Sequence, residues 1–228
     1  MRRRKKLAYW LFVRIPFWFV ALSFAFVLLY KVVPVYFTPL MLVRAVQGER
    51  PIQREWTPLE KISPEMIKAV IASEDNRFAT HNGFDWIEVR KMLDAHQNKG
   101  KKIRGCSTIS QQTAKNVFTF GSSTLVRKGL EAWFTVLIEW IWGKERIMEV
   151  YLNVAETGHG MYGVQAAARK YYDVPAARLT RRQAASIAII LPNPLKYNPK
   201  GDTKFINRRR NAIVALIPKL EYPDWVRQ

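Results

Sequence analysis

An acidic pair stands out in a chain that is otherwise strongly basic. Glu74 and Asp75 lie within VIASEDNRFATHNGFDW, whereas the whole 228-residue sequence has 37 lysines and arginines against 18 acidic residues. A carboxylate can serve as a general base that takes the proton of a weak nucleophile. Such a pair can equally cap or charge the end of a helix. Taken alone, this structural interpretation is at least as good as the catalytic one.

The segment GCSTISQQTAKN, residues 105–116, combines amide side chains with a cation. On a helix, Gln111 and Gln112 precede Lys115 by four and three positions, so all three side chains share one face. The spacing therefore predicts a polar patch whose amides and ammonium group face one way.

Two later segments combine cations with carboxylates. RKGLE, residues 127–131, sets Arg127 and Glu131 on one helix face, which taken alone indicates a surface ion pair of small energy. KERIMEVYLN, residues 144–153, is taken alone an ordinary amphipathic helix. His81, taken alone, is more often a structural hydrogen-bonding residue than a base or a metal ligand.

Hydrophobic periodicity predicts that helices carry most of these residues. Ser63, Pro64 and Glu65 have the pattern of a helix start, and the apolar residues that follow predict a helix ending at Glu74. Further helices are expected over residues 86–98, 107–117, 125–142, 144–152, 164–172 and 180–191, and in a last segment that ends near residue 217. With little strand expected, the fold class is mainly α.

The N-terminus has the features of a membrane anchor. Residues 7–31 are strongly apolar, follow a basic cluster at residues 2–6, and are long enough to span a bilayer. No signal-peptidase cleavage site of the A-x-A type follows the apolar run, which favours an uncleaved anchor over a signal peptide. The positive-inside rule then places residues 1–6 in the cytoplasm and the rest of the chain on the outer side of the inner membrane.

The remaining sequence divides into a membrane-proximal linker at residues 32–56 and one compact domain at residues 57–228. The domain keeps a basic surplus, and outside the cytoplasm this favours lipid phosphates and other membrane lipids over nucleic acid as partners. Cys106 is the single cysteine, and the three histidines are far apart in sequence. No disulfide or metal site is therefore expected.

Taken together and in this order, the four segments resemble the motifs of the peptidoglycan glycosyltransferases, the enzymes that polymerise lipid II. The family motifs are similar to E-D-x-x-F-x-x-H-x-G, G-x-S-T-I-x-Q-Q-x-x-K-N, R-K-x-x-E and K-x-x-I-x-E-x-Y-L-N. They match residues 74–83, 105–116, 127–131 and 144–153. With one short anchor and no penicillin-binding domain, the chain is most similar to the monofunctional members of the family.

The resemblance implies a lysozyme-like fold with a small membrane-facing lobe, and identifies residues 57–228 as the glycosyltransferase domain. The donor is a growing glycan on polyprenyl pyrophosphate, and the acceptor is the 4-hydroxyl of lipid II, which gives a β-1,4 bond with inversion. Glu74 is then the general base, and Glu131 organises the cations or assists the leaving group. The residues expected to bind pyrophosphate and sugar are Ser107, Thr108, Gln111, Gln112, Lys115, Asn116, Arg127, Lys128, Lys144 and Arg146. Structural support is expected from Asp75, Phe78, His81, Glu149 and Asn153.

Several points stay open at this stage. No cofactor is required, although Mg²⁺ or Mn²⁺ at the pyrophosphate is compatible with the chemistry. Cell-wall synthases and division proteins are candidate partners. Ser123 stands where relatives often carry an arginine that is expected to touch pyrophosphate. The alternatives are a lytic transglycosylase or muramidase-like enzyme that cleaves glycan, and a non-catalytic scaffold of the cell-wall machinery.

Overall fold

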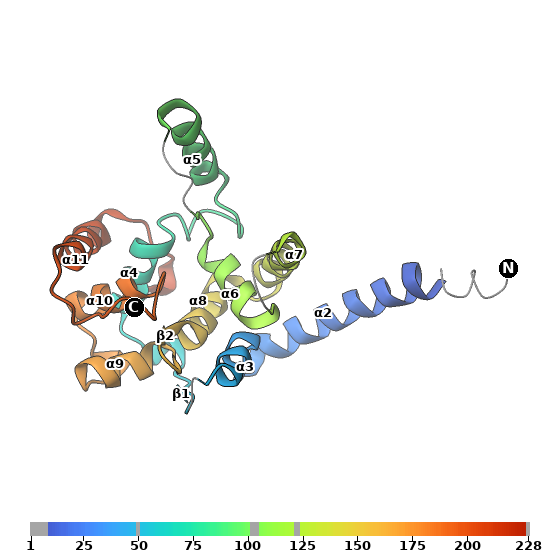
Figure 1. Ribbon diagram of the computed structural model, residues 1–228, viewed down its shortest axis with the longest axis horizontal. Helices are drawn as coiled ribbons and strands as arrows, with labels where there is room; N and C mark the ends of the chain where they lie inside the picture. Colours follow the sequence, from blue (N-terminus) through green and yellow to red (C-terminus); the bar gives the residue numbers. More distant parts are fainter. Residues whose placement is uncertain (1–8, 49–50, 101–104, 121–123, 227–228) are drawn as a thin grey trace.

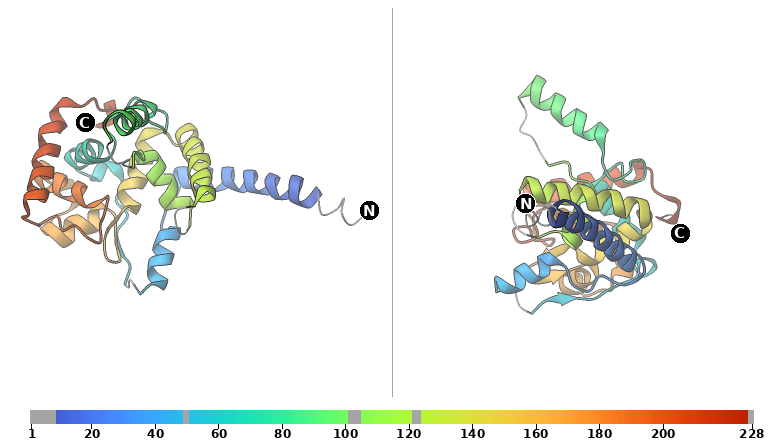
Figure 2. Two further views of the ribbon diagram at one scale, coloured as in Figure 1. Left: turned by 45° about the horizontal axis from the view of Figure 1, so that its top comes forward. Right: turned by 90° about the vertical axis from the view of Figure 1, so that its right-hand side faces the viewer.

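A computed structural model describes residues 9–48, 51–100, 105–120 and 124–226 of the chain. The N-terminal apolar segment forms one long helix that extends away from the rest of the molecule (Figures 1 and 2). A π-helical turn, η1 (Trp10–Arg14), continues into α2 (Ile15–Val32), and most of these side chains are exposed. Together they make 23 residues that are long and apolar enough to cross a bilayer. This agrees with the predicted anchor, while the basic cluster at residues 2–6 lies outside the described residues.

Helix α2 packs against α7 (Leu125–Ile141), so the anchor is joined to the domain by side-chain contacts. The ring of Phe24 meets that of Trp140 edge-on, with centroids 6.2 Å apart. Val27 is fully buried, and its carbonyl oxygen accepts a hydrogen bond of 2.7 Å from Nε1 of Trp142. These contacts fix where the domain sits relative to the end of the anchor.

Within the membrane-proximal segment, the described residues 32–48 and 51–56 include a helix and a short strand that contact the domain. Helix α3 (Pro39–Val46) begins where the side chain of Thr38 accepts a hydrogen bond of 3.3 Å from the backbone N–H of Met41. Met41 is fully buried, and α3 packs against α6 (Ile109–Phe118). Polar residues near Gly48 and Pro51 indicate a linker in the sequence. The structure differs because the apolar face of α3 is buried against the domain.

The domain also contains a small three-stranded sheet with the strand order β1-β3-β2. β1 (Gln53–Arg54) pairs in parallel with β3 (Met161–Tyr162), and β2 (Glu156–Gly158) pairs with β3 in antiparallel fashion. In this register Gln53 lies opposite Met161. The first strand therefore belongs to the stretch that the sequence assigned to the linker.

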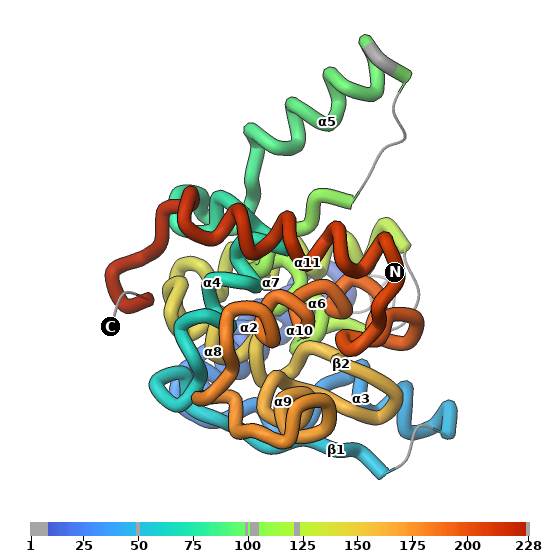
Figure 3. The backbone as a smooth tube through the Cα atoms, turned by 90° about the vertical axis from the view of Figure 1, so that its left-hand side faces the viewer, coloured from blue at the N-terminus to red at the C-terminus, as the bar shows by residue number. Residues whose placement is uncertain are grey.

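Buried helices form the centre of the domain. α10 (Arg181–Ile190) packs between α4 (Pro64–Glu74) and α11 (Lys204–Leu216), as Figure 3 shows. Helix α6 packs against both α7 and α8 (Gly143–Val154). The other helical elements are α9 (Val164–Tyr172), η2 (Leu59–Lys61), η3 (Ala176–Arg178), η4 (Ile217–Lys219) and η5 (Asp224–Val226). The expected mainly α fold class is confirmed.

Helix α5 (Trp86–Lys99) projects from the domain as an arm (Figures 1 and 3). It begins at Asp85, whose carboxylate accepts hydrogen bonds from the backbone N–H groups of Ile87 and Glu88 at 3.1 and 3.0 Å. This arm forms one wall of a cavity that also contains Glu74.

Candidate active site

Glu74 is the last residue of α4 and lines a cavity of about 870 Å³. Its Oε1 accepts a hydrogen bond from Ser73 (2.9 Å) and its Oε2 accepts one from Nε2 of Gln112 (3.2 Å). Burial raises the pKa of Glu74, while those two hydrogen bonds and the charge of Arg209 oppose the shift, and the neighbouring Asp75 adds to it. A carboxylate with a raised pKa at the edge of a cavity is suited to accept a proton.

Asp75 is turned into the protein and joins two helices. Its carboxylate accepts hydrogen bonds from Nε2 of His81 (2.9 Å) and from the backbone N–H of Ile109 at the start of α6 (3.0 Å). The ring of Phe78 lies edge-on to His81, with centroids 6.4 Å apart, and all of these residues are buried. Both acidic residues line the same cavity, but the carboxylate of Asp75 is bonded to His81 and Ile109 and so connects α4 to α6.

Gln112 is held in one orientation by a residue that the sequence analysis did not single out. The hydroxyl of Tyr151 donates a hydrogen bond of 3.2 Å to Oε1 of Gln112, which leaves Nε2 to face Glu74. Tyr151 is buried, and burial together with the charges of Glu74 and Asp75 raises its pKa well above the ordinary value. The phenol therefore stays protonated and remains a donor. Its place within KERIMEVYLN was the only sequence signal.

Replacing Tyr151 with phenylalanine is expected to move the acid limb of the pH–rate profile to higher pH. Without the hydroxyl, the Gln112 amide can turn its oxygen toward Glu74, which favours the protonated carboxyl. A hydrogen bond to a charged group is worth roughly 1.5–3 kcal/mol, so the rate on the acid side should fall about tenfold. Initial rates across pH would measure this. Tyr171→Phe is the matched control, since its hydroxyl donates to the carbonyl oxygen of Thr157 (3.2 Å) and lines neither cavity. Equal profiles for both variants would contradict the expectation.

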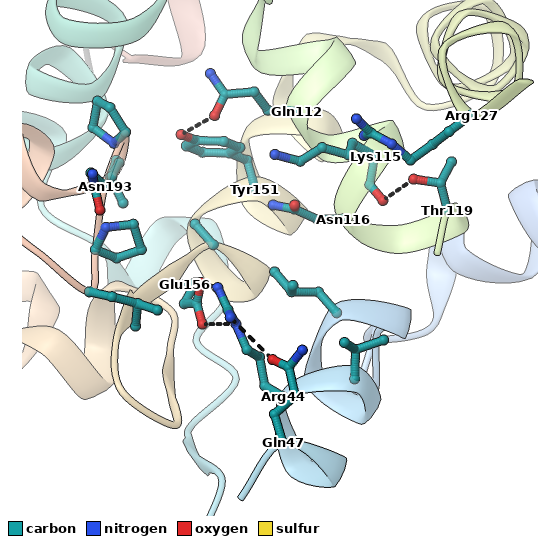
Figure 4. A pocket seen from close by; sticks show the side chains of 17 residues that line it. Arg44, Gln47, Gln112, Lys115, Asn116, Thr119, Arg127, Tyr151, Glu156 and Asn193 are labelled. Carbon is teal, nitrogen blue, oxygen red and sulfur yellow. Dashed lines mark hydrogen bonds and ion pairs between the residues drawn. The ribbon is translucent and has the colours of Figure 1, made fainter. Parts of the chain in front are cut away.

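A second cavity of about 770 Å³ adjoins the first at the hydrogen bond between Gln112 and Glu74. Gln112, Lys115 and Asn116 of α6 line it together with Arg127 of α7, and its other walls come from α3, from β2 and from the loop after α10 (Figure 4). We call it the cationic cleft. Two predicted sugar- or phosphate-binding cations, Lys115 and Arg127, therefore meet in one cavity beside the candidate base.

Glu131 forms ion pairs with the neighbouring cations of α7. It is only 3% exposed, and it forms ion pairs with Arg127 and, at 2.7 Å, with Nζ of Lys128. Desolvation lowers the pKa of Lys115, which the charge of Glu131 opposes and the charges of Arg127 and Lys128 reinforce. A carboxylate paired in this way holds the cations of α7 in fixed positions. The surface ion pair suggested by the spacing alone is wrong, because Glu131 is buried.

The start of α6 uses two predicted binding residues in a capping box. The hydroxyl of Thr108 accepts a hydrogen bond of 3.1 Å from the backbone N–H of Gln111, and the Gln111 side chain accepts one of 3.0 Å from the backbone N–H of Thr108. Ser107 and Thr108 line the cavity of Glu74. Among these residues, Ser107 is therefore the one placed to meet a ligand, whereas Gln111 holds the helix start.

Lys144 and Arg146 are not brought to the cationic cleft. Nζ of Lys144 pairs with Glu139 (2.6 Å) and lies 4.6 Å from the ring centre of Phe78. The guanidinium of Arg146 donates to the carbonyl oxygens of Tyr30 (2.8 Å) and Val33 (2.7 Å) at the end of α2. Neither lines either cavity. Their predicted contact with pyrophosphate is not supported, because they lie on faces of α8 that are turned toward the fold and the anchor.

The last two predicted support residues make contacts within the fold. Glu149 pairs with Arg146, and the Asn153 amide bonds both backbone groups of Thr57, accepting from its N–H (2.7 Å) and donating to its carbonyl oxygen (2.8 Å). Ser123 lies outside the described residues. Within the described ranges, no group of three or more histidine, cysteine or acidic side chains converges as metal ligands would.

Comparison with known proteins places this site in a family. A family model described as Transglycosylase matches residues 41–217, and the chain belongs to that family. The family assignment also confirms the lysozyme-like fold, and the match includes most of α3 and all of β1, which lie before the domain start expected at residue 57.

Curated relatives extend the match over most of the chain. A protein of Caulobacter vibrioides is 51% identical over 187 residues, which cover 82% of this chain and 81% of the relative. One from Bacteroides thetaiotaomicron is 50% identical over 87% of this chain and 82% of the relative. One from Pseudomonas putida is 47% identical over 92% of this chain and 91% of the relative. Each of these relatives is named a biosynthetic peptidoglycan transglycosylase.

Proposed function

We propose that this protein, a glycosyltransferase of peptidoglycan synthesis, polymerises lipid II into β-1,4 glycan strands and releases polyprenyl pyrophosphate. One observation carries the proposal. A carboxylate with a raised pKa, Glu74, is hydrogen-bonded to Gln112, which lines a cleft that also contains Lys115 and Arg127. The proposed reaction needs this combination of one base and several cations.

Glu74 acts as the base toward the acceptor. An alcohol is a weak nucleophile, so the 4-hydroxyl of lipid II gains reactivity as its proton passes to the Glu74 carboxylate. The oxygen then forms a bond to the anomeric carbon of the donor glycan while the bond from that carbon to the pyrophosphate breaks. The hydrogen bond from Gln112, itself held by Tyr151, orients the carboxylate for this transfer.

The cations act on the leaving group. Negative charge accumulates on the pyrophosphate as its bond to the sugar breaks, and fixed positive charge in a partly desolvated cleft stabilises that state. Lys115 and Arg127 line the cleft, and Glu131 fixes Arg127 and Lys128 in place. Because these groups supply positive charge directly, the proposed mechanism requires no cofactor.

The test is polymerisation of labelled lipid II by the full chain purified in detergent, with products separated by length. Long glycan that lysozyme digests is the expected result. Cleavage of purified sacculi into anhydro-sugars, without polymer from lipid II, would instead identify a lytic enzyme and overturn the proposal. Absence of both activities in a folded protein would favour a scaffold.

The domain is proposed to lie on the periplasmic face of the inner membrane, with the N-terminus in the cytoplasm. The basic cluster before the apolar helix supports this orientation. Cys106 is a free thiol that lines the cavity of Glu74, so a membrane-impermeant maleimide should label it in intact spheroplasts. Labelling only after lysis would reverse the orientation. Binding to cell-wall synthases or division proteins remains a prediction, to be tested by copurification after cross-linking in cells.

A further inference from the structure

An ion pair between segments far apart in sequence forms part of the wall of the cationic cleft. Nε of Arg44 in α3 donates to Oε1 of Glu156 in β2 (2.9 Å), and its Nη2 donates to Oε2 (3.1 Å). Nη1 of Arg44 also donates to the side chain of Gln47 (3.3 Å). Both Arg44 and Glu156 line the same cavity as Lys115 and Arg127 (Figure 4).

The position of Glu156 needs an explanation, because the cleft is proposed to hold an anion. Its side chain is buried at 8% exposure, and its negative charge reaches far enough to act on Lys115, where it opposes the lowering of the lysine pKa by desolvation. In a partly desolvated site, an unpaired carboxylate would repel pyrophosphate and attract the lysine. Something must therefore neutralise Glu156 while the cleft operates.

Arg44 has the geometry to do this. A guanidinium that donates to both oxygens of one carboxylate holds it in a single orientation and compensates its charge. Within the described residues, the ammonium group of Lys115 makes no hydrogen bond or ion pair with another side chain, so it is available to a ligand. The pairing thus divides the cations of the cleft, with Arg44 assigned to Glu156 and Lys115 to the substrate.

We propose that Arg44 is a positioning residue for the leaving-group site. By pairing with Glu156 it compensates the charge of this carboxylate, which would otherwise repel pyrophosphate from the cationic cleft. The inference rests on the proposed function of the cleft. It also gives helix α3 a role in the reaction, because this helix follows the anchor directly and brings Arg44 to the site. Arg44 acts through Glu156 and needs no contact with the phosphates.

A double-mutant cycle of charge-removing substitutions separates this role from direct phosphate binding. Binding of inorganic pyrophosphate to the full chain in detergent would be measured by titration calorimetry. Arg44→Gln should weaken binding by about tenfold or more, since it leaves a buried carboxylate unpaired in the cleft. Glu156→Gln should tighten binding, a gain that misfolding cannot produce. The double variant, Arg44→Gln with Glu156→Gln, should return to within about threefold of the parent protein, because both charges are removed together.

Two further variants complete the design. Arg181→Gln removes an arginine that is paired with Glu65 away from the cleft, and it should bind pyrophosphate like the parent protein. Lys115→Gln should weaken binding whatever the role of Arg44. If Arg44→Gln binds normally, or if the double variant stays as weak as Arg44→Gln, the inference is wrong, and the second result would assign Arg44 to direct phosphate contact. If the parent protein does not bind pyrophosphate, or if Lys115→Gln has no effect, the cationic cleft is not the pyrophosphate site. The inference about Arg44 is then wrong as well.

Discussion

Replacing Glu74 with glutamine is expected to lower the rate of lipid II polymerisation by about 10²–10⁴-fold while the protein stays folded. Glutamine has nearly the same shape. Its amide oxygen can accept from Gln112 and its NH2 group can donate to the Ser73 hydroxyl, but it cannot accept the proton of the acceptor hydroxyl. The loss should therefore appear in kcat with little change in the binding of pyrophosphate. Initial rates with labelled lipid II and a thermal unfolding curve for each protein would measure both properties.

The matched control is Glu65→Gln, a change of the same type in the first turn of the same helix. Glu65 pairs with Arg181 on the outside of the domain, so its loss should change the rate little. The pH dependence gives a second check on the parent enzyme. The active form of Glu74 is the carboxylate and its pKa is raised, so activity should disappear as the pH falls through a value above that of an ordinary glutamate. Polymerisation retained by Glu74→Gln would remove Glu74 from the role of base.

Replacing Lys115 with glutamine is expected to lower the polymerisation rate by about 10²–10³-fold. Lys115 lines the cationic cleft, and its pKa is lowered by desolvation, which shows that water screens its charge poorly there. A cation in such an environment stabilises a developing pyrophosphate anion more strongly than an exposed lysine can. Single-turnover rates with lipid II would show whether the loss lies in the chemical step.

Lys170→Gln is the control for this experiment. Lys170 is an exposed residue of α9 that lines neither cavity, so the variant changes the net charge of the protein equally without touching the site. A similar loss in both variants would show that net charge, for example through attraction to anionic lipid, governs the rate. A normal rate for Lys115→Gln would exclude this lysine from stabilising the leaving group.

In the motif KERIMEVYLN, the structure places two residues away from the cleft to which the family resemblance assigned them. These cations, Lys144 and Arg146, belong to a motif of the family, and they were expected at the pyrophosphate. The structure turns Lys144 toward Glu139 and Arg146 toward the carbonyl oxygens at the end of α2. The side chain of the motif that reaches the site is Tyr151. Residues on one helix point to different sides of it, and only the neighbouring elements show which side faces the substrate.

Local chemistry determined much of this protein directly. The apolar run sets the anchor helix, and the helix ending at Glu74 begins at Pro64 as expected. The helix expected over residues 180–191 is present as well, and it starts with a capping box between Thr180 and Gln183. At the start of α4 the detail differs, because the hydroxyl of Ser63 donates to the carbonyl oxygen of Leu179 and does not cap the helix. Periodicity and capping depend on residues within about one helical turn, which is why the sequence can predict them.

Only the tertiary structure decided how the acidic pair divides and which charges share the cleft. The carboxylate of Asp75 accepts a hydrogen bond from the backbone N–H of Ile109 at the start of α6, whereas that of Glu74 accepts one from the side chain of Gln112. Arg44 and Glu156 are 112 residues apart, and no local pattern connects them. Contacts of this kind form when packed helices bring distant segments together. The sequence therefore predicts which residue types the reaction needs, and packing determines which of those residues meet.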